Sequence, residues 1–184
     1  SSSYCYPDTG KPNVEGDDAL GEPPLIHYGL GWIKRYIETL CRHHQMTSKT
    51  KFGIIRPVAY FGPHDNFDLE TAHVIPSLIR KVVEGQDPIQ VWGDGKEVRS
   101  VGYVDDIADG LLEVVANYAV AEPLNICLPR PYTVEEILMR IIRFVRNNQI
   151  IFNQPRIEFD RTKPSAIPYK VSDPSKAKRL LGFE

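Results

Sequence analysis

The 184-residue sequence lacks the glycine-rich patterns with which two common classes of nucleotide-binding protein hold phosphate groups. Neither G-x-G-x-x-G nor G-x-x-x-x-G-K-[ST] occurs, so these residues contain no familiar cradle for a pyrophosphate. The sequence also has no C-x-x-C pair, and its three cysteines, Cys5, Cys41 and Cys127, are far apart and odd in number. We therefore expect neither a disulfide framework nor a metal site.

An excess of charge and a long apolar run are absent as well. The 22 Lys and Arg residues are scattered among 24 Asp and Glu residues, for a formal net charge of -2, which argues against nucleic acid as a partner. No apolar run approaches the ~20 residues needed to cross a bilayer, and residues 1–25 do not have the profile of a signal peptide. We expect no membrane partner and a cytoplasmic location.

Segments with helical and with strand periodicity alternate along the chain, which indicates an α/β fold class. Helices are expected over about 25–45, 72–85, 105–115, 133–145 and 173–182. Strands are expected over 51–57, 89–92, 98–104, 124–128 and 156–159, with a long loop over 61–68. Asp105 or Asp106 is expected to cap its helix, and the sequence Thr133-Val-Glu-Glu136 predicts a capping box.

Three groups of side chains could carry proton or hydride chemistry. They are the serines at positions 1–3, Tyr28 with Lys34, and His73. Each group also has an ordinary structural interpretation, because terminal serines, helix-surface lysines and histidines at helix starts are usually solvated or cap backbone groups. Taken singly, none of the three identifies a reaction.

The order of several motifs along the chain resembles the extended short-chain dehydrogenase/reductases, the NAD(P)-dependent epimerase/dehydratase family. The motifs are Ser2-Ser-x-x-Tyr-Pro7, Lys34 on a helix, Arg56-Pro57 before Gly62-Pro63, Val91-Trp-Gly-Asp-Gly95 and Val104-Asp-Asp106. Within this family, residues 62–80 look most like the GDP-L-fucose synthase group. The resemblance implies a Rossmann-like fold with a small α/β substrate-binding domain, of which this chain matches the C-terminal part.

The resemblance also implies a domain organisation and a cofactor. Residues 1–60 would be the last strands and the active-site helix of the dinucleotide-binding domain, and residues 61–184 would be mostly the substrate-binding domain, with interleaved Rossmann elements. A complete enzyme of this family uses NAD or NADP. Because the glycine-rich strands of the family would precede Ser1, we expect this chain alone to bind either cofactor weakly or not at all.

Roles for individual residues follow from the resemblance. Ser2 matches the serine that hydrogen-bonds the reacting sugar oxygen, and His73 matches the histidine used in epimerisation, whose partner cysteine is replaced by Tyr4. Lys34 matches the lysine that lowers the pKa of the catalytic tyrosine and holds the nicotinamide ribose, and Pro57 also lies on the cofactor side. The residues matching positions that contact the nucleotide and sugar are Arg80, Trp92, Arg99 and Lys163.

The position of the catalytic tyrosine has two alternatives. The family tyrosine lies four residues before the lysine, one helical turn away on the same face, and here that position holds Leu30. The nearest tyrosine, Tyr28, lies six residues before Lys34, so it would reach the site only through a local break at Gly29 or Gly31.

The function that the resemblance implies is epimerisation and reduction of a nucleotide sugar, with a GDP-4-keto-6-deoxy sugar favoured. The alternatives are a non-catalytic module that binds nucleotide sugars or another partner, and a fragment that assembles with a partner. The family also forms dimers through the helix corresponding to 25–45, which implies a possible homodimer.

Overall fold

The structure is a computed structural model that describes residues 1–151, 153–163 and 167–183, and the chain divides into two compact units. Unit 1 comprises Ser1–Tyr60, Ser100–Pro131 and Lys170–Glu184. Unit 2 comprises Phe61–Arg99 and Tyr132–Tyr169. The chain therefore leaves unit 1 twice and returns to it twice.

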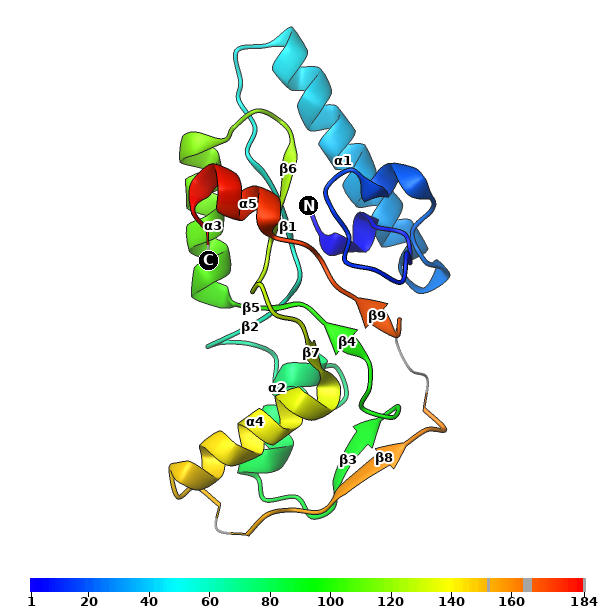
Figure 1. Ribbon diagram of the computed structural model, residues 1–184, viewed down its shortest axis with the longest axis vertical. Coiled ribbons are helices and arrows are strands. Elements are labelled where there is room, and N and C mark those ends of the chain that lie inside the picture. Colours follow the sequence, from blue (N-terminus) through cyan, green and yellow to red (C-terminus); the bar gives the residue numbers. More distant parts are fainter. Residues whose placement is uncertain (152, 164–166, 184) are drawn as a thin grey trace. The chain divides into compact units, whose positions relative to one another are not determined.

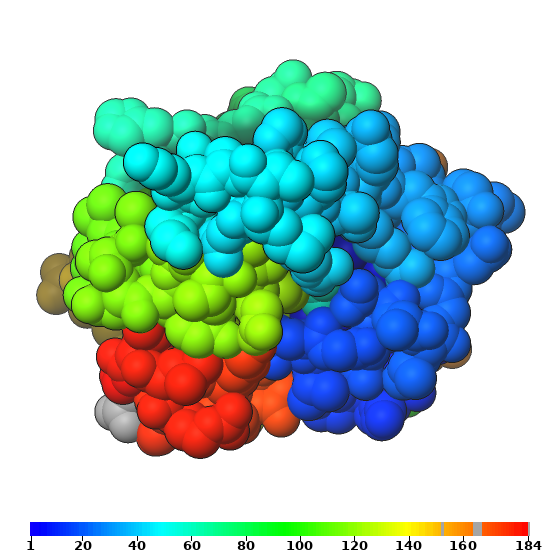
Figure 2. Space-filling model, turned by 90° about the horizontal axis from the view of Figure 1, so that it is seen from above, coloured from blue at the N-terminus to red at the C-terminus, as the bar shows by residue number. Residues whose placement is uncertain are grey.

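Unit 1 is built on a parallel pair of strands, β1 (Ile54–Pro57) and β6 (Pro123–Ile126). The helices α1 (Tyr28–Thr47), α3 (Val104–Asn117) and α5 (Ser175–Leu181) belong to the same unit (Figure 1). Its apolar core consists of Ile55, Ile107, Val114, Leu124, Ile126 and Ala177. In Figure 2 the N-terminal residues, the end of α1, the segment around the end of α3 and the C-terminal residues appear together on one face.

Short turns and strands complete unit 1. The 3-10 turns are η1 (Ser3–Cys5), η2 (Asp17–Leu20) and η3 (Leu25–His27), and all three precede α1. The strand β2 (Ala59–Phe61) pairs with β5 (Val101–Tyr103).

Unit 2 contains the parallel strands β3 (Ile89–Trp92) and β8 (Ile157–Asp160), and an antiparallel pair, β4 (Val98–Arg99) and β7 (Tyr132–Thr133). The strand β9 (Tyr169–Lys170) lies on the other side of β4. The helices α2 (Val74–Val83) and α4 (Val134–Asn147) pack against each other through an apolar stripe on each (Figure 1). The buried residues of these two stripes include Ile75, Leu78, Val82, Leu138, Ile142 and Val145.

The α/β class is confirmed, and the structure refines the predicted ends of several elements. The capping box is present, because the Thr133 Oγ1 accepts from the Glu136 N–H at 3.0 Å and the Glu136 carboxylate accepts from the Thr133 N–H at 2.9 Å. The capping prediction for α3 is wrong: Tyr103 is the N-cap residue, and Asp105 and Asp106 lie in the first turn, where their charge favours the positive end of the helix dipole. Strands of two or three residues, such as β2, β7 and β9, have no periodicity that a sequence could reveal.

The helix α1 buries its polar side and exposes its apolar side. Gly31 and Glu38 are buried, whereas the stripe Ile33, Tyr36 and Ile37 is 55%, 63% and 43% exposed. An amphipathic helix of a monomeric protein normally does the reverse. This stripe is therefore an apolar surface without a partner among the described residues.

Three further observations concern the described part of the chain. None of its helices combines the length and apolar character required to span a bilayer. Within residues 1–151, 153–163 and 167–183, no three His, Cys, Asp or Glu side chains come together as a metal site. All three cysteines are free thiols.

Candidate functional site

The structure distributes the predicted site residues over both units. Unit 1 holds Ser2, Tyr28, Lys34 and Pro57, and unit 2 holds His73, Arg80, Trp92, Arg99 and Lys163. The two groups are described separately.

Ser2 is held in place at the start of the η1 turn. Its Oγ accepts a hydrogen bond from the Tyr4 N–H at 3.3 Å, which makes Ser2 the N-cap residue of η1. A serine hydroxyl that accepts one hydrogen bond still has its proton to donate. Ser2 can therefore donate to an oxygen of a bound molecule without giving up its structural contact.

Two close contacts fix η1 against α1. A Cβ on Gly31 would lie 2.5 Å from the Pro23 Cβ and 2.6 Å from the Tyr4 carbonyl oxygen, so only glycine fits there. One turn later, the Arg35 guanidinium donates to the Cys5 carbonyl at 2.8 Å. These contacts set the position of the Ser2 turn relative to the helix that carries Lys34.

The face of α1 that carries Lys34 does not carry Tyr28. The helix is continuous from Tyr28 onward, without a break at Gly29 or Gly31. At 3.6 residues per turn, Leu30 lies on the Lys34 face one turn earlier, and Tyr28 lies about 120° around the helix from Lys34. The Tyr28 hydroxyl instead donates to Glu22 Oε1 at 3.4 Å, and its ring makes an edge contact with the Trp32 ring.

Cys5, the last residue of η1, has a buried thiol of low reactivity. Its side chain is 0% exposed, and burial raises the pKa of the thiol to about 12. A thiol with that pKa stays protonated at neutral pH and is a poor general base. Its burial and raised pKa argue against Cys5 as the epimerisation cysteine, whose position the resemblance assigns to Tyr4.

Glu38 on α1 and Arg56 on β1 form a buried ion pair, which the sequence analysis did not predict. Glu38 lies one turn after Lys34, and both of its carboxylate oxygens accept from Arg56, at 2.8 Å from Nε and 2.6 Å from Nη2. Arg56 is completely buried and also contacts the Glu15 carbonyl and the Asp18 carboxylate. Burial favours the neutral carboxyl, but the hydrogen bonds and charge of Arg56 outweigh it and lower the pKa of Glu38.

The network continues from Arg56 to the segment that carries Ser2. The Arg56 guanidinium lies 4.8 Å from the centre of the Tyr6 ring, and the Tyr6 hydroxyl donates to Asn125 Oδ1 at 2.7 Å. Burial raises the pKa of Tyr6, so this phenol remains a donor at neutral pH. Arg56 therefore joins α1, β1 and the segment of residues 2–6.

One sequence signal pointed to Glu38 as part of this region: Glu38 lies four residues after Lys34, on the same helix face.

In unit 2, Trp92 and Lys163 form an exposed aromatic and cationic pair. Trp92 ends β3 with its side chain 60% exposed, and the Lys163 ammonium lies 5.6 Å from the centre of the indole ring. Lys163 follows Asp160, the last residue of β8, in a turn that the Asp160 carboxylate closes by accepting from Thr162. An exposed indole beside a cation can stack on a base and attract a phosphate.

The remaining candidates of unit 2 are partly engaged in structure. Arg80 donates to Glu84 Oε1 at 2.7 Å and to the Phe67 carbonyl at 2.9 Å, so it supports the loop before α2. His73 is exposed and occupies the N-cap position of α2 without a side-chain cap bond. Arg99 is half-buried on β4, where one of its nitrogens donates to the Val98 carbonyl at 2.9 Å.

Comparison with known proteins identifies the family. The model described as "NAD dependent epimerase/dehydratase family" matches residues 1–127. The chain belongs to this family. It is 27% identical over its whole length to dTDP-4-dehydro-6-deoxy-D-allose reductase of Streptomyces bikiniensis, of which it covers 54%. It is 31% identical over 128 residues to GDP-L-fucose synthase 1 of Arabidopsis thaliana, a match that covers 67% of this chain and 38% of the relative.

A solved structure supports the same assignment. The GDP-L-fucose synthetase of Naegleria fowleri superimposes on the whole chain with a TM-score of 0.87 and 28% identity, and 58% of its own length is covered. A second crystal structure of that protein has NADP bound. A protein similar to this chain thus binds NADP. The present chain spans about half the length of the curated relatives that it matches.

The residues present fit NAD or NADP in part. The two residues that the resemblance assigns to the nicotinamide ribose both belong to unit 1: Lys34 is half-buried on α1, and Pro57 ends β1. These 184 residues contain no glycine-rich strand-to-helix turn for the pyrophosphate.

Proposed function

We propose that this chain binds a GDP-linked 4-keto-6-deoxy sugar and takes part in its epimerisation and reduction. The observation that carries the proposal is the exposed Trp92 with the Lys163 ammonium over its ring. Such a pair suits a nucleotide, because the indole can stack on the base while the cation attracts the phosphates. Arg99 and Arg80, in the same unit, provide guanidinium groups that can bind phosphate oxygens through two hydrogen bonds at once.

In unit 1 the proposal assigns proton chemistry to Ser2. Its hydroxyl donates to the C4 oxygen of the sugar, while its own Oγ stays fixed by the Tyr4 N–H. The nicotinamide of NAD or NADP, when bound, supplies or accepts the hydride. Lys34 contributes a positive charge beside the ribose and the reacting oxygen.

A second candidate function is a non-catalytic module that binds nucleotide sugars. The continuous helix α1 favours it, because Leu30 occupies the position one turn before Lys34 and the Tyr28 hydroxyl bonds to Glu22. The two functions share the nucleotide site and differ in proton transfer.

Nucleotide binding can be tested with the two tryptophans of the chain, Trp92 and Trp32. We expect GDP to quench tryptophan fluorescence in the wild type and in Trp32→Phe, but not in Trp92→Phe. Calorimetry on Trp92→Ala should show GDP affinity about tenfold lower, because stacking of a base on an aromatic ring contributes about 1–3 kcal/mol. Unchanged GDP affinity in Trp92→Ala would remove this residue from the site, and tighter binding of dTDP than GDP would contradict the choice of nucleotide.

We also propose that the chain forms a homodimer through α1. The exposed stripe of Ile33, Tyr36 and Ile37, with the neighbouring Leu40, supports this proposal. Contact with a second copy of the chain would remove this apolar surface from water. Sedimentation velocity should show a dimer that Tyr36→Lys converts to a monomer. Leu112→Lys, at an equally exposed apolar position on α3, should leave the dimer intact. A monomeric wild type would overturn this proposal.

A further inference from the structure

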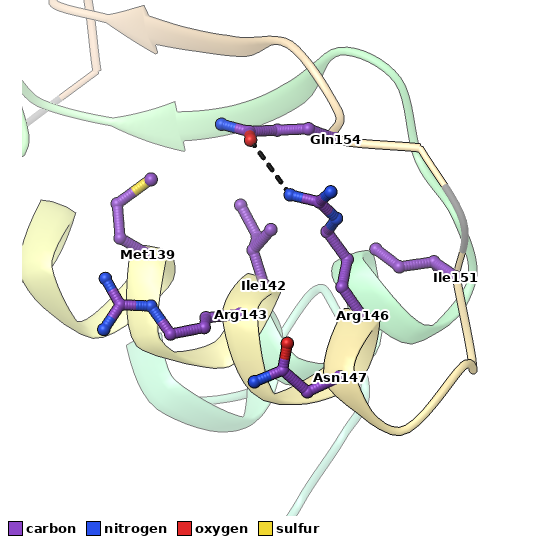
Figure 3. Close-up of a pocket in the computed structure, with 7 residues that line it drawn as sticks. All are labelled: Met139, Ile142, Arg143, Arg146, Asn147, Ile151 and Gln154. Atoms are coloured by element: carbon purple, nitrogen blue, oxygen red, sulfur yellow. Dashed lines mark hydrogen bonds between the residues drawn. The ribbon is translucent and has the colours of Figure 1, made fainter.

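A hollow on α4 has the chemistry of an anion site, apart from every residue assigned above. It has a volume of about 370 Å³ and lies beside the last turns of the helix, within unit 2 (Figure 3). Arg143, Arg146, Asn147 and Gln154 provide its polar lining, and Met139 and Ile142 provide apolar surface. None of its lining residues carries a negative charge.

The two arginines of this hollow, Arg143 and Arg146, have no carboxylate partner among the described residues. Arg56, Arg80 and Arg156 each form an ion pair with an Asp or Glu. Among the residues that the structure describes, Arg143 and Arg146 form none, although they repel each other from neighbouring positions on one helix. A bound anion would balance this charge.

Hydrogen bonding orients part of this lining. Arg146 Nη1 donates to Gln154 Oε1 at 3.2 Å, which holds its guanidinium over the hollow, as the dashed line in Figure 3 shows. The remaining N–H groups of Arg146, those of Arg143 and the Asn147 amide are donors suited to phosphate oxygens.

The end of a helix carries partial negative charge, which opposes an anion, but here the last carbonyls are occupied. The carbonyls of Phe144, Val145 and Arg146 accept from the N–H groups of Asn148, Ile150 and Gln149, respectively, at 2.9–3.1 Å. Two guanidinium charges exceed the fraction of a charge that remains at such a terminus. The net field in the hollow therefore favours an anion.

We infer that this hollow binds a small phosphomonoester, with the phosphate on Arg146 beside Gln154 and the attached group on Ile142 and Met139, toward the end where Arg143 lies (Figure 3). A phosphomonoester carries about two negative charges at neutral pH, which matches two arginines. The volume exceeds that of a phosphate ion and is within the range of small-molecule sites, so it leaves room for a sugar or nucleoside. This site is independent of the proposed nucleotide-sugar site, which uses other residues of unit 2.

NMR titration of the full chain tests the inference, with the side-chain Nε–Hε signals of the arginines as the readout at the hollow. AMP and glucose 1-phosphate should shift the signals of Arg143 and Arg146 in a saturable way, inorganic phosphate more weakly, and adenosine not at all. The stronger of the two esters identifies the attached group. Trp92 fluorescence reports the other site separately, so either proposal can fail alone.

Matched variants complete the experiment. Arg143→Gln and Arg146→Gln should each weaken binding about tenfold, since each removes charge-assisted hydrogen bonds while keeping helix propensity. Arg140→Gln is the control, because Arg140 lies on the same helix but stacks over Tyr132 and does not line the hollow. An equal loss in Arg140→Gln would show diffuse charge attraction, and an absence of saturable shifts would show no site; either result overturns the inference.

Discussion

Replacing Arg56 with methionine should destabilise the chain by about 3–5 kcal/mol, because it leaves the Glu38 carboxylate buried without its partner. Urea unfolding followed by circular dichroism measures the change. Arg42→Met is a matched control: Arg42 pairs with the same carboxylate at 3.5 Å, but its side chain is 45% exposed, and such pairs contribute at most about 1 kcal/mol. Similar losses in the two variants would mean that the buried geometry has no special energetic role.

The same pair predicts how stability depends on pH. Arg56 holds the pKa of Glu38 below its ordinary value of 4.5 despite burial. The stabilisation from this shift is therefore fully present above the unfolded-state pKa and is lost as the pH falls through the lower folded-state pKa. Glu38→Gln should flatten the acid limb of the stability profile, and an unchanged limb would assign the acid sensitivity to other carboxylates.

Introducing a phenol at position 30 should raise catalytic activity by about 10²–10⁴-fold, the contribution of a well-placed acid or base. Leu30 lies one turn before Lys34 on the same face of the continuous helix α1, so Leu30→Tyr places a hydroxyl where the Lys34 ammonium can lower its pKa. The measurement is hydride transfer to a GDP-4-keto-6-deoxy sugar. It uses this chain fused to the cofactor-binding half of a related enzyme.

The parent fusion and Tyr28→Phe provide the controls for position 30. Low activity in the parent, unaffected by Tyr28→Phe, agrees with the position of Tyr28 away from Lys34. Full activity in the parent that Tyr28→Phe abolishes would show that Tyr28 reaches the substrate, which would require α1 to unwind near Gly29 and Gly31.

Local features of this chain were predictable because a few adjacent residues determine them. The capping box of Thr133 and Glu136 and the apolar stripe of α2 follow from spacings of three and four residues, which the structure reproduces. The position of Leu30 relative to Lys34 is equally local, since a continuous helix fixes it. The roles assigned to Ser2, His73, Trp92 and the other site residues remain predictions, and the experiments above test those of Trp92 and Tyr28.

The features that could not be predicted depend on residues far apart in the sequence or on a partner. Glu38 and Arg56 are 18 positions apart, and nothing in either local sequence shows that their charges meet in the interior. The orientation of α1 was hidden for a related reason: its apolar stripe suggests burial, but the interior of unit 1 takes Gly31 and Glu38 instead. Periodicity shows that a helix has two faces and does not show which one the rest of the chain covers.

The hydrogen bonds of Asn125 determine which segments must be synthesised before unit 1 can complete its folding. Its Nδ2 donates to the Asn13 carbonyl at 3.0 Å and to the Asp173 carbonyl at 3.1 Å, and its N–H donates to Glu15. One side chain thus connects residue 13 with residue 173, which are 160 positions apart in the sequence. Unit 2 has all its segments once Tyr169 has been synthesised, whereas unit 1 also needs residues 170–184, so the earlier segments of unit 1 stay incomplete until those residues follow.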